Sequence, residues 1–385
     1  MSNNAIFSST APSTCVIGWD VGGAHIKAVA LNVQGEVLHT LQMPCPLWRG
    51  LEQLETATQS VLTTLNIKSN HVQHVVTMTG ELVDLFLNRH AGVVEIATKL
   101  SQLLSRDGNL YDGNLRDVNL KVQFYAVNNG FVPLAEAFAL TADIASANWH
   151  ASASALAMHV QDALLVDIGS TTTDIIAIQS GKVHAQSISD VQRMQVDSLV
   201  YTGVVRTPVM ALANKLTFEG AKTNVAAEYF ATMADVYRLT GELAQGADMA
   251  ETADGKGKSV LESARRLARM IGHDVEDKPI EIWKNLADTC RNVQFDQIKT
   301  AILKHLKPDI PIIGAGTGSF LVKALADDLG CTYLPVSSVI EKHFKSNQAL
   351  EVCFPAYAVA SLFLSLNQHQ TQLQQQTQLS QQRHA

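Results

Sequence analysis

Two short stretches, far apart in the chain, share an aspartate, a glycine and the same spacing. Residues 19–32 read WDVGGAHIKAVALN and residues 166–179 read VDIGSTTTDIIAIQ, and they align without a gap when Asp20 is placed on Asp167. Glycine lets a ligand approach the backbone, consecutive N–H groups in such a turn bind anions, and aspartate can hold Mg²⁺ through water. The pair therefore predicts two loops that grip a phosphate-bearing ligand.

Each loop brings further polar groups to this chemistry. Lys27 and His25 add positive or donor character to the first loop, and three threonines add hydroxyl donors to the second. The alternative is two ordinary hairpin turns, which the match in register disfavours. The residues expected to bind diphosphate or nucleotide in these loops are Gly22, Gly23, His25, Gly169, Ser170, Thr171, Thr172 and Thr173.

A third glycine-rich motif follows near the C-terminus. Residues 311–325 read PIIGAGTGSFLVKAL, which predicts a strand, a tight turn and the start of a helix. The first N–H groups of a helix have no partner within the helix and bind phosphate readily. The expected diphosphate or nucleotide contacts here are Gly314, Gly316, Thr317 and Gly318. Close packing between strand and helix is the alternative interpretation.

Four charged residues are weaker candidates for substrate binding. Arg206 lies in the proline-bounded stretch YTGVVRTPV, where a guanidinium could hold a phosphate or carboxylate through two hydrogen bonds. Asp235 precedes Arg238 by three residues, so a local helix pair explains it as well. Asp254 lies in the loop ETADGKGKS, which either closes over substrate or only links helices. Arg266 shares a helix face with Arg269 and could equally be a surface residue.

The elements around the two Asp-Gly loops repeat as well. Three-strand meanders are predicted over 16–41 and 164–187, which suggests two similar α/β domains. The predicted first domain covers 14–160, ends in an alanine-rich helical segment from 132, and receives a C-terminal helix at 347–366. The second covers 161–346 with a mainly helical insertion at about 200–308. The glutamine-rich residues 367–385 are expected to be disordered.

Composition narrows the classes of partner. The formal charge of −7 gives no basic field, so nucleic acid is an unexpected partner. The first residues lack the pattern of a signal peptide, and the longest apolar run, near the C-terminus, is shorter than a membrane span. Five scattered cysteines without a CxxC motif fit a reducing cytosol and offer neither a zinc site nor a disulfide framework. A cytoplasmic protein with no membrane partner is expected; its oligomeric state is not indicated.

The three motifs in this order resemble the sugar kinase/Hsp70/actin superfamily, and the chain is most similar to its hydantoinase/oxoprolinase-like branch. Within that branch it resembles the tetrahydromethanopterin-linked C1 transfer pathway protein family, through GWDVGGAHIKA, TMTGELVD, SANWHASA, VDIGSTTTDII, YTGVVRTPV, FATMADVYRLTGE and RRLARMIGHD. These stretches extend over most of residues 15–320. The first loop departs from the family, which has Gly-Ala-Asn-Thr-Lys where this chain has Gly-Ala-His-Ile-Lys.

The resemblance implies an α/β protein of two ribonuclease-H-like domains of the actin type, with an active site in the cleft between them. It implies a transferase of methanofuran-type one-carbon carrier biosynthesis, which joins an aminomethylfuran-methyl diphosphate to the phenol of a glutamylated tyramine or tyrosine and releases pyrophosphate. Asp20, Lys27, Asp167 and Asp174 are then the catalytic candidates. Asp20 and Asp167 would hold Mg²⁺, and Asp174 or His25 would accept the phenolic proton.

Two other functions stay open at this point. The third motif favours a nucleotide, so an ATP-dependent kinase or a hydantoinase/oxoprolinase-like amidohydrolase would use the same loops. A nucleotide-sensing protein with negligible turnover is the remaining alternative. The sequence does not distinguish a tyramine from a tyrosine acceptor, since the two differ by one carboxylate.

Overall fold

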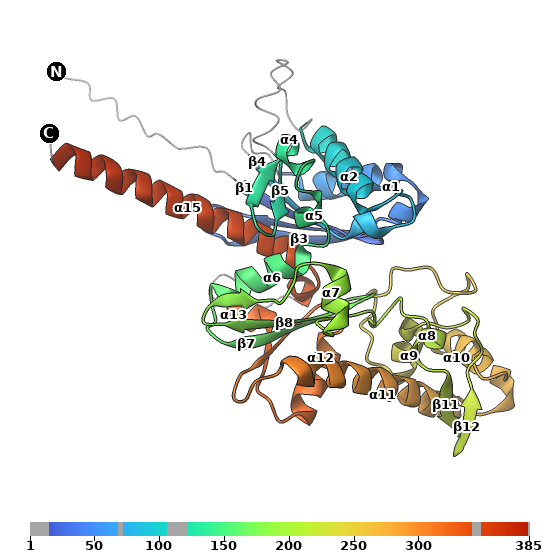
Figure 1. Cartoon of the computed structure of the whole chain (residues 1–385). Coiled ribbons are helices and arrows are strands. Elements are labelled where there is room, and N and C mark those ends of the chain that lie inside the picture. Colours follow the sequence, from blue (N-terminus) through green and yellow to red (C-terminus); the bar gives the residue numbers. More distant parts are fainter. Residues whose placement is uncertain (1–14, 68–71, 106–121, 341–347, 384–385) are drawn as a thin grey trace, which may run out of the picture. The chain divides into compact units, whose positions relative to one another are not determined.

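The computed structural model describes residues 15–67, 72–105, 122–340 and 348–383, and the chain divides into two compact units (Figure 1). Unit 1 comprises Met1–Ala151 and Pro355–Ala385, and unit 2 comprises Ser152–Phe354. The division falls inside helix α6 (Asn148–Ala157), earlier than the predicted boundary at 160. Residues 14, 68–71, 106–121, 341–347 and 384–385 of the predicted ranges lie outside the described residues. The cleft expected between the domains stays a prediction.

Unit 1 is built on a mixed sheet with the strand order β3-β2-β1-β4-β5-β6. Strands β1 to β3 form an antiparallel meander, β4 and β5 run parallel to β1, and β6 is antiparallel to β5. The strands are β1 (Cys15–Val21), β2 (His25–Leu31), β3 (Val37–Pro44), β4 (Val72–Met78), β5 (Val122–Ala126) and β6 (Gly130–Pro133).

Helices cover this sheet, and β1 and β2 are almost fully buried. Apolar residues of α1 and α2 pack with Trp19 in one core cluster. On β1, a Cβ added to Gly18 would lie 1.9 Å from the carbonyl oxygen of Ala356, so α15 packs directly on the strand backbone. The helices of unit 1 are η1 (Leu47–Arg49), α1 (Leu51–Leu65), η2 (Gly80–Leu82), α2 (Arg89–Leu104), α4 (Leu134–Ala137), α5 (Thr141–Ile144) and α15 (Phe354–Arg383).

Unit 2 repeats the arrangement with the strand order β10-β8-β7-β13-β14, and β9 also pairs with β8. Here too an antiparallel hairpin, β7 and β8, is followed by strands parallel to its first member. The strands are β7 (Ala163–Ile168), β8 (Thr173–Gln179), β9 (Lys182–His184), β10 (Leu199–Val200), β13 (Ile312–Ala315) and β14 (Tyr333–Pro335), with a separate hairpin of β11 (Lys215–Phe218) and β12 (Ala221–Asn224).

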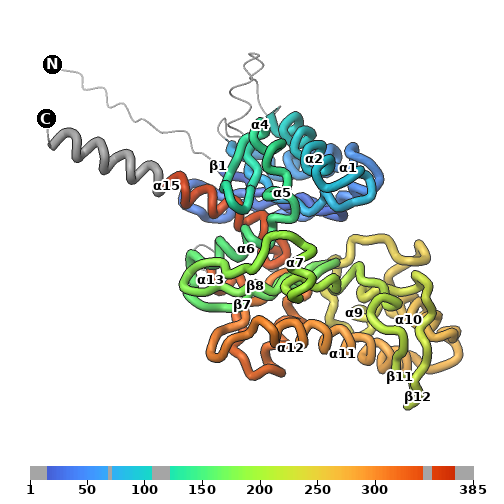
Figure 2. The backbone as a smooth tube through the Cα atoms, in the orientation of Figure 1, coloured from blue at the N-terminus to red at the C-terminus, as the bar shows by residue number. Residues whose placement is uncertain are grey.

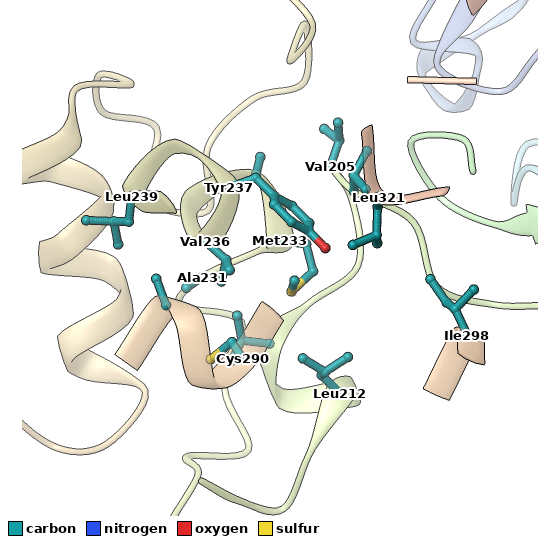
Figure 3. Close-up of a cluster of buried hydrophobic side chains, with 14 of the residues drawn as sticks. Val205, Leu212, Ala231, Met233, Val236, Tyr237, Leu239, Cys290, Ile298 and Leu321 are labelled. Carbon is teal, nitrogen blue, oxygen red and sulfur yellow. The ribbon is translucent and has the colours of Figure 1, made fainter. Parts of the chain in front are cut away.

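A helical layer gives unit 2 its larger core. The long helix α11 packs along α9 and α10 (Figure 2), and Tyr237 of α9 inserts its ring among Val205, Met233 and Leu321 (Figure 3). The helices are α7 (Asp190–Gln195), α8 (Val209–Leu212), α9 (Met233–Thr240), α10 (Val260–Arg269), η3 (Val275–Asp277), α11 (Ile280–His305), α12 (Ser319–Asp328), α13 (Val336–Ile340) and α14 (Gln348–Val352).

Three sequence predictions differ from this structure. The alanine-rich segment 132–160 is not one helix, because it is interrupted after Pro133 and at Ser146, whose φ is 53°. The insertion at 200–308 begins with turns and the β11–β12 hairpin rather than helices, since proline and glycine interrupt it. In place of a disordered tail, α15 continues through Arg383, because residues 367–383 contain neither glycine nor proline and glutamine is a good helix former.

In the described part of the chain, no helix is long and apolar enough to cross a membrane.

Candidate functional site

The two Asp-Gly loops share the same cross-strand pairing and the same hydrogen bond that closes the turn. Across the first hairpin Asp20 pairs in register with Lys27, and across the second Asp167 pairs with Asp174. The N–H of Gly22 donates to the carbonyl of His25 at 2.9 Å, and the N–H of Gly169 donates to the carbonyl of Thr172 at 2.9 Å. The duplication seen in the sequence is therefore a duplicated turn geometry, with one copy in each unit.

In unit 1 the first loop is fixed by backbone hydrogen bonds from two neighbouring segments. The N–H of Leu47 donates to the carbonyl of Gly23 at 3.0 Å, and the N–H of Thr79 donates to that of Val21 at 2.9 Å. The side chain of Asp20 is buried, and its Oδ2 lies 3.1 Å from Nζ of Lys27, which is partly exposed. Lys27 is thus a fixed positive charge beside an anion-binding turn.

A buried glutamate, which was not among the predicted site residues, lies in the segment that packs against this loop. Glu81 is 1% exposed and accepts a hydrogen bond from Oγ of Ser146 at 2.8 Å. It belongs to η2, whose Gly80 lies close to the carbonyl oxygens of Val21 and Gly22. In the sequence, the indication of this role is the glutamate of TMTGELVD, which directly follows a predicted strand. A carboxylate buried at such a position requires a hydrogen-bond partner.

In unit 2 the second loop rests on the segment around Arg206. The N–H of Arg206 donates to the carbonyl of Ser170 at 2.8 Å, and that of Val204 donates to the carbonyl of Gly169 at 3.1 Å. A Cβ on Gly203 would lie 2.5 Å from the amide nitrogen of Thr171, so only glycine fits between them. The structure therefore places Arg206 next to the loop, as a phosphate- or carboxylate-binding role requires.

The hydroxyls of the second loop have different environments. Thr173 is fully buried, and its Oγ1 donates to the carbonyl of Thr202 at 2.7 Å. Gln294 of α11 then holds Thr202 through a 2.6 Å hydrogen bond to its hydroxyl. Ser170, Thr171 and Thr172 are partly exposed. Thr173 thus supports the loop from behind, and the other three hydroxyls can reach a ligand.

The third motif lies beside Asp167 in the same unit. The N–H of Gly318 donates to the carbonyl of Ile168 at 2.8 Å, and α12 begins at Ser319. A Cβ on Gly316 would lie 2.3 Å from Oδ1 of Asp167. Thr317 is partly exposed, whereas Gly314 packs against the ring of Tyr333. Unit 2 therefore joins an acidic residue, a hydroxyl-rich turn and a helix N-terminus.

Asp174 is held by an arginine that the sequence analysis did not identify. Nη2 of Arg193 lies 2.6 Å from Oδ1 of Asp174 and 3.1 Å from the carbonyl of Ser198, and the arginine side chain is 3% exposed. Taking a proton would disrupt this buried ion pair. The geometry therefore favours Asp174 as a fixed charge beside Asp167 over Asp174 as the proton acceptor.

The three other weak candidates meet in one buried ion network. Nε and Nη2 of Arg266 donate to Oδ1 of Asp235 at 2.9 and 2.7 Å, and Nη1 donates to Oδ1 of Asp254 at 3.0 Å. Arg238 donates to the same oxygen of Asp235 at 2.9 Å and also pairs with Asp248. Burial lowers the pKa of Arg266, but the hydrogen bonds and charges of its two aspartates outweigh this and raise it.

This network has a structural role in unit 2. Arg266 is 0% exposed, and its Nη1 also donates to the carbonyl of Gly257 at 3.0 Å. Together with the ion pair to Asp254, this bond fixes the segment 241–259 on α9 and α10. The guanidinium of Arg266 is directed at internal partners, so Arg206 is the better placed of the two arginines for substrate.

Gly316 offers a direct test of the unit 2 site. We expect Gly316→Ala to weaken binding of magnesium pyrophosphate at least tenfold (about 1.4 kcal/mol), because the new methyl group would displace the carboxylate of Asp167 and the carbonyl oxygen of Ile168, each 2.3 Å from the added Cβ. Gly220→Ala is a matched control, since Gly220 has the same φ of 83° but no neighbouring atom within 4 Å of an added Cβ. Calorimetric titration measures both; equal affinities would show that the contact with Asp167 is irrelevant to binding.

The donor set fits a magnesium ion that keeps several waters. Within the described residues, no group of three or more histidine, cysteine, aspartate or glutamate side chains could hold a metal by itself. Asp167 is partly exposed, with Asp174 opposite it, and provides the hard oxygen ligands that Mg²⁺ prefers. A bound ion would therefore depend on phosphate oxygens and water for its remaining ligands.

Three of the buried cysteines are unsuited to nucleophilic chemistry. Burial raises the pKa of the Cys15 thiol to about 11 and the pKa values of the Cys45 and Cys290 thiols to about 12. A thiolate is the reactive form, and these thiols stay protonated near neutral pH. The chemistry of the site therefore depends on carboxylates, Lys27, hydroxyls and backbone N–H groups.

Comparison with known proteins gives two relatives that carry the same name. The chain is 29% identical over 352 residues to the (4-{4-[2-(gamma-L-glutamylamino)ethyl]phenoxymethyl}furan-2-yl)methanamine synthase of Methanocaldococcus jannaschii, covering 90% of this chain and 97% of the relative. It is also 29% identical over 206 residues to the protein of the same name from Methanococcus vannielii, covering 52% of this chain and 90% of that relative.

A solved structure and a family model complete the comparison. The nucleotide-free structure of acetone carboxylase superposes with a TM-score of 0.51 at 12% identity, covering 91% of this chain and 70% of that one. With the strand orders of both units, this confirms the predicted fold of two ribonuclease-H-like domains. The hydantoinase/oxoprolinase family model matches residues 74–362, which confirms the predicted branch. The chain belongs to the hydantoinase/oxoprolinase family.

Proposed function

We propose that the protein is a transferase that forms the aryl ether of a methanofuran-type one-carbon carrier. The observation that carries the proposal is the similarity to the synthase of M. jannaschii over 97% of that protein's length. The name of that relative describes a product in which a phenol oxygen is bonded to a methylene group on a furan. The bond to be formed is therefore between a phenol oxygen and a furanylmethyl carbon.

The chemistry follows from a diphosphate leaving group. The bond between the methylene carbon and the diphosphate oxygen breaks, and its electron pair leaves with pyrophosphate. The furan ring stabilises the resulting cation, and the phenol of a glutamylated tyramine or tyrosine attacks it while losing its proton to an acceptor. The main task of the protein is to stabilise negative charge on the departing pyrophosphate, which is electrostatic catalysis.

The residues suit these tasks. In unit 1, Lys27 presents a positive charge beside the first loop. The N–H groups of Gly22 and Gly169 close the turns of their own units, so phosphate oxygens would be bound by the remaining N–H groups of each turn. In unit 2, Asp167, with Asp174 beside it, would hold a magnesium ion, whose charge would offset that of phosphate oxygens. Arg206 could bind a phosphate or the carboxylate of the acceptor.

One observation favours a second candidate function. The third motif places Gly316, Gly318 and the start of α12 next to Asp167, an arrangement suited to nucleotide phosphates. An ATP-dependent kinase or amidohydrolase would use this part of unit 2. A nucleotide-sensing protein would bind ATP there without turnover.

One set of incubations separates the three functions. With ATP and Mg²⁺ alone, we expect no ADP; with the furanylmethyl diphosphate and γ-glutamyltyramine, we expect equal amounts of pyrophosphate and aryl ether. Enzymatic detection of ADP, phosphate and pyrophosphate, with mass spectrometry of the ether, gives the answer. ADP formed only with an acceptor would instead support the kinase or amidohydrolase, and ATP binding without any product would support the sensor.

A further inference from the structure

A row of three polar side chains crosses the sheet of unit 1 beside the first loop. Asp20 of β1 lies in register with Lys27 of β2 on one side and with Thr77 of β4 on the other. Residues directly opposite each other on neighbouring strands project to the same face of a sheet. The three side chains therefore face the same side at the carboxyl end of β1.

The corresponding row of unit 2 has different chemistry. Asp167 is in register with Asp174 on β8 and with Ala315 on β13. The lysine is replaced by an aspartate and the threonine by an alanine. Because the two hairpins are otherwise equivalent, the cation and the hydroxyl of unit 1 indicate a ligand that the unit 2 row does not bind.

Two atoms of the unit 1 row are buried without a hydrogen bond. Within the described part of the molecule, Oδ1 of Asp20 and Oγ1 of Thr77 have no partner, and their side chains are 2% and 0% exposed. An unsatisfied buried polar atom costs roughly 1–3 kcal/mol, more when it is charged. Two such atoms on adjacent strands at the end of a phosphate-binding hairpin therefore call for a ligand group that satisfies both.

The types of these atoms restrict that group. A carboxylate oxygen only accepts hydrogen bonds, so the ligand must donate to Asp20, while the hydroxyl of Thr77 can donate in return. A diphosphate oxygen cannot donate a hydrogen bond to Asp20 and is repelled by its carboxylate. A divalent cation is disfavoured because Lys27 already places a positive charge 3.1 Å from the same carboxylate. A hydroxyl group, which both donates and accepts, fits.

We propose that Asp20 and Thr77 bind the phenolic hydroxyl of the acceptor substrate, which donates to Oδ1 of Asp20 and accepts from Oγ1 of Thr77. The inference rests on the proposed transferase function and identifies Thr77 as a positioning residue for the attacking oxygen. Lys27 fixes the carboxylate through its other oxygen. The departing diphosphate and the incoming phenol then lie at neighbouring points of one row.

The test is the preference for a phenol over its methyl ether. Binding of γ-glutamyltyramine and of its O-methyl ether, which cannot donate, is measured by calorimetry with magnesium pyrophosphate present. We expect the wild-type protein to bind the phenol about tenfold more tightly. That preference reports the hydrogen bond donated to Asp20. Thr77→Val, which removes the hydrogen bond that the phenol oxygen accepts, should weaken binding of the phenol about tenfold, whereas Thr77→Ser should keep the wild-type affinity. Binding of magnesium pyrophosphate should be the same in all variants.

Thr58 provides a matched control. It lies in α1, is fully buried, and its Oγ1 also has no hydrogen bond in the described structure, so Thr58→Val removes an equivalent hydroxyl away from the row. Thr58→Val should keep the wild-type affinity for the phenol. Thr77→Ala, which copies Ala315 of unit 2, serves as a second variant if valine disturbs folding.

The possible failures are distinct. A Thr77→Val protein that binds the phenol as tightly as wild type, or a wild-type protein that binds phenol and ether equally, overturns the hydroxyl site while leaving the transferase intact. A wild-type protein that binds neither compound overturns the proposed function and this inference together.

Discussion

Replacing Lys27 with methionine is expected to lower kcat for pyrophosphate release by about 100- to 1,000-fold, the usual cost of losing one preorganised group that stabilises transition-state charge. Lys27 is held 3.1 Å from Asp20 and is partly exposed beside the first loop. Its charge is therefore in place before the diphosphate departs and requires no rearrangement. The measurement is steady-state release of pyrophosphate with both substrates saturating.

Three further variants serve as controls for this result. Lys27→Arg keeps the charge and should recover part of the rate. Lys182→Met, an exposed lysine on β9, should leave kcat unchanged. Because Lys27→Met leaves the buried carboxylate of Asp20 without its partner, Asp20→Asn/Lys27→Met removes both charges and separates a folding defect from lost catalysis. A Lys27→Met protein with nearly normal kcat and intact thermal stability would contradict the proposed role.

The part of the site that the sequence predicts is the part set by local geometry. Asp20 and Lys27 are seven residues apart on either side of a tight hairpin, and so are Asp167 and Asp174. Once the hairpin is predicted, its length fixes which residues face each other across the strands. The same reasoning gave the strands of both meanders to within a few residues and the glycine-rich start of α12.

The partners from distant segments could not be predicted in this way. Thr77 meets Asp20 only because β4 pairs in parallel with β1, and Arg193 reaches Asp174 only because α7 folds back on β8. Thr77 begins the stretch TMTGELVD, but nothing in that stretch indicates that Asp20 is its neighbour, and Arg193 lies outside the stretches that carry the resemblance. The alanine-rich segment from 132 misled for a different reason, since helix propensity is a weak preference and Gly130–Pro133 pairs with β5 as a strand.

The burial of a charged side chain could not be predicted from the pattern of its own helix. Arg266 shares a helix with Arg265 and Arg269 and looks like a surface residue, because arginine is seldom fully buried. Three aspartates in two other segments make its burial possible by pairing with it or with Arg238. The pattern of one helix does not contain that information.

Replacing Arg266 with methionine should destabilise unit 2 by about 3–5 kcal/mol, because removing one member of a buried ion network leaves buried negative charge uncompensated. Among the described residues, Asp235 would keep only Arg238 as an ionic partner, and Asp254 would keep only Arg269, whose Nη1 lies 3.8 Å from its Oδ2. The neighbouring Arg265 is the matched control. It pairs with Glu276 at 3.0 Å on the surface, so Arg265→Met should change stability little. Urea unfolding of the full chain, followed by circular dichroism, compares the two variants.

The kinetic behaviour of the same variant separates structure from substrate binding. Arg266 is 0% exposed and its donors are directed at Asp235, Asp254, Ser263 and Gly257, so the folded fraction of Arg266→Met should keep the wild-type KM for both substrates. Arg206→Met should show the reverse, a raised KM with nearly unchanged stability, because its backbone already holds the loop at Ser170. If Arg266→Met raised KM without loss of stability, Arg266 would bind substrate directly and the network would not be the support of segment 241–259.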